Sequence, residues 1–111
     1  MMRQKLANMA IEVEVGRLMS YRLAWMQSQG RKPSHEASAV KVYVSELIQR
    51  MANVGVQALG LYAALSPSKR DPLIEWLQRN YLSCVCETIL AGTSEIQRNI
   101  VATRGLGLPR S

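Results

Sequence analysis

Residues 90–98, which read L-A-G-T-S-E-I-Q-R, have types and a spacing that suit ligand binding. Thr93 is a strong helix N-cap residue, and Glu95 places an acid in the first turn, where it complements the helix dipole. Ala91 and Gly92 form a turn before this cap, so backbone N–H groups point out of the helix start toward an anionic or carbonyl-bearing ligand. Two interpretations stay open at this point: a capped helix start alone, or a ligand site.

No second chemical constellation is visible in the sequence. Cys84 and Cys86 are one residue apart, so a helix would point them to opposite sides, and we expect neither a disulfide nor a metal pair. His35 is the single histidine, and no metal site can be assembled from it. We interpret the cysteines as small core residues of a protein in the reducing cytoplasm.

The net charge of +6 does not indicate a nucleic-acid partner. The basic residues gather at chain breaks and in the tail, with no dense recognition helix and no interleaved aromatic residues. No stretch approaches the ~18 uncharged apolar residues that a membrane span needs. We therefore expect neither nucleic acid nor a membrane as a partner.

Four helices must position these residues. Apolar periodicity and breaks at Gly, Pro and Ser predict helices over residues 3–29, 34–64, 71–91 and 94–104, with an exposed loop over residues 66–71. Short connections between them predict one all-α domain, residues 1–111, folded as an antiparallel up-and-down four-helix bundle.

The first helix carries apolar residues on two faces. One stripe suits the bundle core, with Gly16 allowing close approach of a neighbouring helix, and a second stripe comprises Ile11, Val15, Leu18 and Trp25. This second stripe predicts a contact with another domain or subunit. Residues 51–65 contain no ionisable side chain except Tyr62, so we expect them to be buried nearly all round.

The order of several motifs resembles the C-terminal helical domain of the acyl-CoA dehydrogenases, over nearly the whole chain. The strongest match is G-T-S-E-I-Q-R at residues 92–98, and V-Q-A-L-G at residues 56–60 matches the start of a V-Q-x-L-G-G segment. The first helix has the family's spacing at Glu14, Arg17 and Arg22, and the ending L-G-L-P-R resembles that of bacterial members.

This resemblance implies an FAD cofactor. Thr93 and Glu95 match residues that contact the FAD of their own subunit. Gln57 and Gly60 match residues at the adenosine-pyrophosphate end of the FAD of a neighbouring subunit. The resemblance also implies acyl-CoA as the substrate and a homo- or hetero-oligomer, either a dimer or a tetramer.

Three departures from the family pattern bear on activity. Ala91 occupies the position at which many members carry the glutamate base that removes the α-proton, and alanine cannot accept a proton. Leu61 and Ala63 replace family glycines and put bulk where the backbone would approach a pyrophosphate. The family's N-terminal helical and middle β domains are absent from these 111 residues, so we expect no catalysis from this chain alone.

The sequence therefore predicts the C-terminal domain of an FAD-dependent enzyme that oxidises acyl-CoA to the 2,3-unsaturated thioester. In that enzyme it would contribute FAD contacts and an oligomer interface. Two alternatives stay open: a non-catalytic helical oligomerisation module, or the subunit of a heteromeric dehydrogenase that lacks the base.

Overall fold

The computed structural model describes residues 1–64 and 72–110. Every regular element in these two ranges is helical, which confirms the all-α class. The elements in chain order are α1 (Met2–Ser28), α2 (His35–Leu59), the 3₁₀ segment η1 (Gly60–Ala64), α3 (Pro72–Ser83), the 3₁₀ segment η2 (Cys84–Thr88), α4 (Ser94–Ile100) and the π-helical segment η3 (Val101–Gly105).

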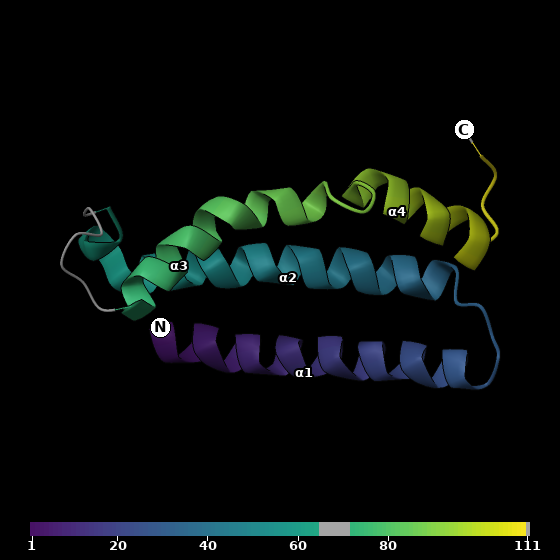
Figure 1. Ribbon diagram of the computed structural model, residues 1–111, viewed down its shortest axis with the longest axis horizontal. Helices are drawn as coiled ribbons and strands as arrows, with labels where there is room; N and C mark the ends of the chain where they lie inside the picture. The colour runs from purple at the N-terminus through teal and green to yellow at the C-terminus, as the bar shows by residue number, and fades with distance from the viewer. Residues whose placement is uncertain (65–71, 111) are drawn as a thin grey trace.

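The helices form three rows with α2 in the middle (Figure 1). The first row is α1, which runs antiparallel to α2. On the other side of α2, α3 and α4 follow one another in the same direction, and both contact α2. The resulting molecule is elongated, 51 × 29 × 26 Å. The expected arrangement of four helices side by side is therefore not confirmed, because α3 and α4 together make one row.

A close approach joins α1 to α2, as the sequence predicted at Gly16. Gly16 is buried, and a Cβ atom placed there would lie 3.5 Å from the Tyr43 ring of α2. The Tyr43 hydroxyl donates to the Glu12 carbonyl oxygen at 3.1 Å. The side of α1 that carries these contacts is thereby fixed against α2, and its opposite side faces away from the protein.

The second helix ends five residues before the predicted boundary. It stops at Leu59 because Gly60 takes φ +56° and ψ −132°, a conformation that residues with a Cβ rarely adopt. The expected burial of residues 51–65 is wrong: in the described part of this stretch only Ala52 is buried, and Leu61 is 89% exposed. Residue 65 lies outside the described residues.

The third row is interrupted where the sequence predicted continuous helices. After Ser83 the chain tightens into η2, and α2 side chains bond the polar groups of this segment. Gln49 Nε2 donates to the Cys84 carbonyl at 3.2 Å, and Lys41 Nζ donates to the Glu87 carbonyl at 2.9 Å. The predicted start at Asp71 and the predicted loop over residues 66–71 lie outside the described residues.

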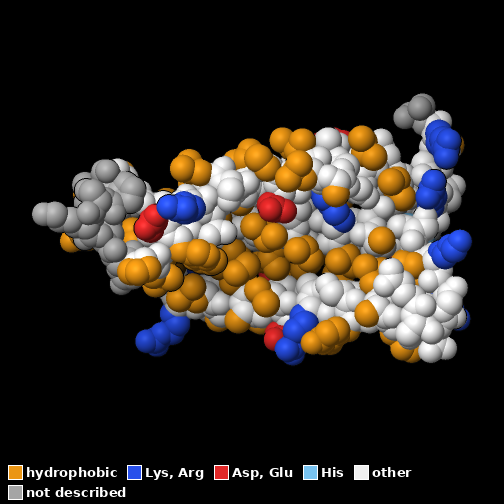
Figure 2. All heavy atoms as spheres, viewed as in Figure 1, with side chains coloured by type: hydrophobic (Ala, Val, Ile, Leu, Met, Phe, Trp, Pro, Cys, Tyr) orange, Lys and Arg blue, Asp and Glu red, His pale blue; other side chains and the backbone are white. Residues whose placement is uncertain are grey.

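Little apolar surface is hidden by three rows of helices. The buried apolar side chains among the described residues are Met26, Leu47, Ala52 and Cys84. Cys86 is exposed, so the core interpretation holds for Cys84 and is wrong for Cys86. Figure 2 shows apolar side chains over much of one face of the molecule. None of the helices in the described ranges combines the length and hydropathy needed to cross a membrane.

Candidate functional site

The turn before α4, residues 90–95, is called the capped turn here. Ala91 and Gly92 both have positive φ, +56° and +94°, and such a value is uncommon for a residue other than glycine. Gln97 Nε2 donates to the Ala91 carbonyl at 2.9 Å and bridges the turn. The capped turn is therefore held by a side chain of the helix that follows it.

Thr93 is the N-cap of α4, as the sequence predicted. Its φ and ψ are −64° and 158°, and its Oγ1 accepts a hydrogen bond from the Ile96 N–H at 3.3 Å. The pKa of Glu95 lies below its ordinary value, mainly because its carboxylate accepts from its own backbone N–H. The Thr93 hydroxyl and the positive charge of Arg98 lower this pKa further. Glu95 therefore presents an ionised acceptor beside the cap.

A polar pocket of about 490 Å³ lies between the capped turn and α2. The capped turn and α4 contribute Thr93, Ser94, Glu95 and Arg98, and α2 contributes Glu46, Gln49 and Arg50. Arg98 forms an ion pair with Glu46 across the pocket, which fixes α4 on α2. The pocket thus presents hydroxyl, amide, carboxylate and guanidinium groups together, with charges of both signs.

Ser94 is one of several residues of this pocket that sequence reasoning did not single out. It is 6% exposed, and its Oγ has no hydrogen-bond partner within the described part of the chain. A buried hydroxyl without a partner costs about 1–3 kcal/mol, so a position of this kind favours a bound polar group. Its burial depends on the packing of α4 against α2, which the local pattern G-T-S does not reveal.

Ala91 supplies no acid or base at the capped turn, because its side chain is a methyl group. The carboxylates that line the polar pocket are Glu46 and Glu95. Glu46 is engaged by Arg98, and Glu95 is the group whose pKa is lowered. A carboxylate with a lowered pKa is a weak base, so the described geometry favours ligand binding at this pocket over proton abstraction.

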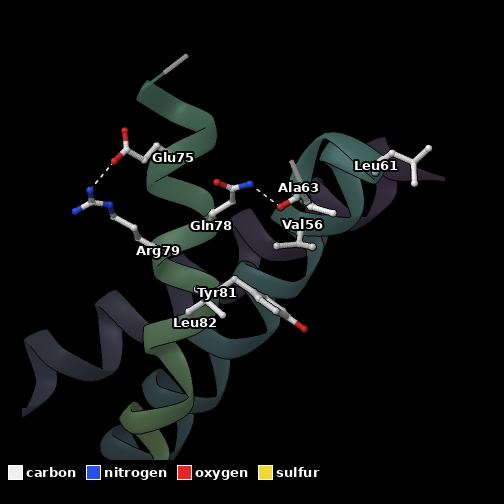
Figure 3. Close-up of a pocket in the computed structure, with 10 residues that line it drawn as sticks. Val56, Leu61, Ala63, Glu75, Gln78, Arg79, Tyr81 and Leu82 are labelled. Carbon is white, nitrogen blue, oxygen red and sulfur yellow. Dashed lines mark hydrogen bonds and ion pairs between the residues drawn. The ribbon is translucent and has the colours of Figure 1, made fainter. Parts of the chain in front are cut away.

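The second predicted cofactor segment, residues 56–63, is called the α2-end segment here. Gln57 accepts a hydrogen bond from Lys5 Nζ of α1 at 2.8 Å. Gly60 lines an apolar pocket of about 610 Å³ at the junction of α2, η1 and α3, together with Val56, Leu61, Ala63, Tyr81 and Leu82 among others (Figure 3). Gln57 does not line this pocket.

The structure does not bring the two predicted pairs together. Thr93 and Glu95 share the polar pocket, whereas Gly60 lies at the apolar pocket, and no residue lines both. The end of α2 and the start of α4 also lie apart along the long axis of the molecule (Figure 1). Within one copy of the chain, the two segments therefore do not line one common pocket.

Comparison with known proteins identifies the family of this chain. The model of the acyl-CoA dehydrogenase C-terminal domain matches residues 1–106. Among curated proteins, acyl-CoA dehydrogenase FadE26 of Mycobacterium tuberculosis is 33% identical over 111 residues, which cover 96% of this chain and 28% of that protein. The caffeyl-CoA reductase-Etf complex subunit CarC of Acetobacterium woodii is 29% identical over 97 residues, 87% of this chain and 24% of that protein.

Solved structures agree with this result. The ChsE4–ChsE5 complex of Mycobacterium tuberculosis matches with a TM-score of 0.86 and 32% identity over 99% of this chain. A G363A variant of the Tcur3481–Tcur3483 steroid ACAD matches with a TM-score of 0.89 and 25% identity over 99% of this chain. In both cases this chain covers 29% of the solved chain, so it spans under a third of the relatives it matches.

Proposed function

Because the chain belongs to the acyl-CoA dehydrogenase family, as its C-terminal domain, we propose that its polar pocket contacts FAD in an enzyme that oxidises acyl-CoA thioesters to their 2,3-unsaturated products. The supporting observation is the pocket at the capped turn, with the partnerless hydroxyl of Ser94 at its wall. When bound, FAD supplies the oxidant that accepts a hydride.

The residues of the polar pocket fit the hydroxyl- and phosphate-bearing part of FAD. Thr93 and Ser94 offer hydroxyl groups, and the Arg98 guanidinium, which pairs with Glu46 through one nitrogen, offers further N–H donors. Glu95, held ionised, accepts from ligand hydroxyl groups. The role of these residues is to bind and orient the cofactor, and the proton-accepting base must come from another part of the complete protein.

The α2-end segment fits a pyrophosphate less well. Leu61 and Ala63 line the same pocket as Gly60, and that pocket is mostly apolar. A diphosphate needs donors, and the two donor side chains that line this pocket already have partners: Gln78 donates to the Ala63 carbonyl, and Arg79 pairs with Glu75. For Gln57 and Gly60, the proposed role is a contact with the FAD of a neighbouring subunit, made by the Gln57 amide and the Gly60 backbone. The apolar pocket itself is not part of this proposed FAD contact.

A second candidate function is the base-lacking subunit of a heteromeric dehydrogenase. Ala91 favours it, because the usual carboxylate position carries a methyl group. Two of the matching solved structures, the ChsE4–ChsE5 complex and the Tcur3481–Tcur3483 steroid ACAD, are each named for two components. In this case a partner subunit would supply the base. The third possibility, a helical oligomerisation module without flavin, predicts no FAD affinity at all.

The proposed location is the cytoplasm, the expectation drawn above from cysteine usage. We include this location in the proposal, together with a role in acyl-CoA metabolism.

Titration of FAD against the complete protein tests the proposal. Replacing Thr93 and Ser94 together by alanine removes two hydroxyl groups from the pocket and should weaken FAD binding about tenfold. The matched control is Thr103→Ala: this threonine lies in η3, and its hydroxyl donates to the Asn99 carbonyl. It should bind FAD as the wild type does.

Three outcomes separate the candidate functions. FAD binding that the double variant leaves unchanged would contradict the proposed site. Binding by the wild type with dehydrogenase activity only after a second subunit is added would favour the heteromeric candidate. A complete protein that binds no FAD would favour the oligomerisation module.

A further inference from the structure

Two ion pairs join α2 to its neighbouring helices at the level of the polar pocket. Glu46 of α2 pairs with Arg98 of α4. One helical turn later, Arg50 of α2 pairs with Glu12 of α1. Three of these four residues line the polar pocket, and Glu12 is the one that does not. Arg50 is therefore a charged residue of the pocket whose partner charge comes from outside it.

The guanidinium of Arg50 has hydrogen-bond donors that the pair with Glu12 does not use. Its Nε and Nη2 both donate to Oε2 of Glu12, the first at 3.1 Å, and its Nη1 has no partner in the described part of the chain. The Arg50 side chain is 47% exposed and that of Glu12 is 35% exposed. An ion pair in contact with water holds its partners weakly. The Arg50 guanidinium can therefore bond a second acceptor.

Gln49, the other α2 residue of this pocket with N–H groups in its side chain, is already engaged. Its Nε2 donates to the Cys84 carbonyl at 3.2 Å and to the Thr88 hydroxyl at 3.0 Å, both in η2. A side-chain amide nitrogen carries two N–H groups, so these two bonds use both donors. Among the α2 residues that line the polar pocket, Arg50 is therefore the one that keeps donors for a ligand.

The charged groups of the pocket are divided between its two sides. On the side of α4, Arg98 pairs with Glu46, and its charge also lowers the pKa of Glu95. On the side of α1, Arg50 lines the polar pocket and also a neighbouring pocket of about 450 Å³ that includes Met19 of α1. Carboxylate and hydroxyl groups suit the hydroxyl groups of a ligand, whereas a guanidinium suits its phosphate. The pocket can therefore bind both kinds of group in one ligand.

We propose that Arg50 is a phosphate-binding residue of the polar pocket, a role that none of the sequence motifs assigns to it. The inference rests on the proposed function and adds the residue that binds the anionic part of the ligand. A guanidinium suits this task because two of its N–H groups match the spacing of two phosphate oxygens, and its charge opposes that of the anion. The phosphate belongs to FAD or to coenzyme A, both of which contain a diphosphate.

Glu12 and a phosphate compete for the same guanidinium. The carboxylate of Glu12 cancels part of the Arg50 charge that a phosphate meets. Loss of either residue removes the same ion pair between α1 and α2, but only loss of Arg50 removes the positive charge from the pocket. Glu12 and Arg50 therefore provide two variants that are matched in structure and opposite in charge.

Titration of FAD and of coenzyme A into the complete protein tests this role. Arg50→Gln should weaken the binding of at least one of the two ligands about tenfold, because a charge-assisted hydrogen bond is lost. Glu12→Gln, which breaks the same ion pair, should bind that ligand as tightly as the wild type or more tightly. At about 0.5 M salt, binding by the wild type should weaken more than binding by Arg50→Gln, since salt screens the contact between charges.

A charge control, a conservative variant and a fold check accompany this series. Arg17→Gln removes a positive charge from α1, where Arg17 pairs with Glu14 of the same helix, and should leave both affinities unchanged. Arg50→Lys keeps the charge without the planar fork and should recover part of the lost affinity. Far-UV circular dichroism verifies that each variant has the helix content of the wild type.

The two ligands identify the source of the phosphate. A loss confined to FAD assigns Arg50 to the FAD diphosphate, and a loss confined to coenzyme A assigns it to the phosphates of the thioester substrate. Equal losses in Arg50→Gln and Glu12→Gln would show that the ion pair acts through the fold, and this result would overturn the inference. Unchanged binding of both ligands by Arg50→Gln, or a complete protein that binds neither, would also overturn it.

Failure of the flavin proposal is recognised separately. In that case the double alanine variant of Thr93 and Ser94 binds FAD as the wild type does, or the complete protein binds no FAD. The inference about Arg50 then still stands or falls with the binding of coenzyme A by Arg50→Gln and Glu12→Gln.

Discussion

The capped turn and the α2-end segment both contain a glycine with positive φ near a pocket, yet they differ in how they are held. At the capped turn, Gln97 bonds the Ala91 carbonyl, and the Arg98–Glu46 ion pair fixes the adjoining helix on α2. At the α2-end segment, Gly60 has no atom within 4 Å of a would-be Cβ, and Leu61 is almost fully exposed. The first is a cross-linked polar site, and the second is an open apolar one.

This difference assigns different tasks to the two regions. A cofactor with phosphates and hydroxyl groups needs fixed donors and acceptors, which the capped turn provides before any ligand arrives. An open apolar end needs a partner that covers it, such as another domain or subunit. We therefore expect substitutions at the capped turn to change the free energy of unfolding and the affinity for the ligand. Substitutions at the α2-end segment should mainly change the association with the covering domain or subunit.

Alanine substitutions of Gly60 and Gly92 should give the largest difference in the free energy of unfolding between the two regions. Gly60→Ala forces a side chain onto a backbone with φ +56° and should lower the free energy of unfolding by about 1–2 kcal/mol. Gly92→Ala carries the same kind of backbone cost, and its Cβ would lie 2.5 Å from Gln97 Nε2, so the bond to the Ala91 carbonyl is also lost. We expect a total of about 2–3 kcal/mol.

Urea unfolding of both alanine variants measures the contrast. Gly105→Ala, at the end of η3, tests a glycine without a positive φ. A Cβ atom there would lie 3.0 Å from the His35 ring, so this variant measures crowding without the backbone cost. Equal losses at Gly60 and Gly92 would show that the cross-link through Gln97 adds nothing to the capped turn.

The cap itself gives the next largest effect. Thr93→Ala removes the oxygen that accepts from the Ile96 N–H and should cost about 1 kcal/mol in the free energy of unfolding. Thr93→Ser keeps a hydroxyl at the same position and should recover most of that loss. Unfolding of the two variants side by side measures it, and an alanine variant as stable as the serine variant would contradict the capping role.

The capped turn was predictable because its determinants are local. The N-cap bond joins Thr93 to a residue three positions later, and the acid at Glu95 reaches its own backbone N–H. The second apolar face of α1 was predictable for the same reason, since helical spacing alone places Leu18 and Trp25 on one side. In both cases the feature is determined by residues that lie close together in the sequence.

The pocket and the helix breaks depend on contacts distant in sequence. Ser94 is buried where α4 packs against α2, and Gln49 donates to the Cys84 carbonyl of η2 from 35 residues away. Burial of residues 51–65 was predicted from their apolar composition, but three rows of helices offer too few neighbours to cover them. The helix ends early, at Leu59, because of the backbone conformation of Gly60. The sequence alone does not reveal this end, because Gly55 is also a glycine and lies within the same helix.

Ala91 offers a smaller test of the capped turn. Its φ of +56° costs an alanine more than a glycine, so Ala91→Gly should raise the free energy of unfolding by about 0.5 kcal/mol after the extra backbone entropy of glycine is subtracted. Thermal unfolding would show a slightly higher Tm. The matched change Ala52→Gly, within α2, should have the opposite sign. A loss of stability in Ala91→Gly would mean that the methyl group makes a favourable contact.

The smallest effect is the pH dependence contributed by Glu95. Its folded-state pKa lies below the ordinary value of 4.5, so folding favours the ionised form. The stabilisation is present above the unfolded-state pKa and is lost as the pH falls through the folded-state pKa. The stability difference between the wild type and Glu95→Gln should therefore be constant near neutral pH and shrink below about pH 4.5. Glu36, whose pKa is also lowered, is present in both proteins and cancels in the difference.

Salt separates the causes of this shift. The largest cause is the hydrogen bond to the backbone N–H of Glu95, followed by the Thr93 hydroxyl, and the charge of Arg98 comes last among the lowering causes. At about 1 M salt, screening removes most of the attraction to an exposed guanidinium and leaves hydrogen bonds in place. The pH-dependent difference should therefore survive high salt, and its disappearance would show that the charge of Arg98, and not the helix start, keeps Glu95 ionised.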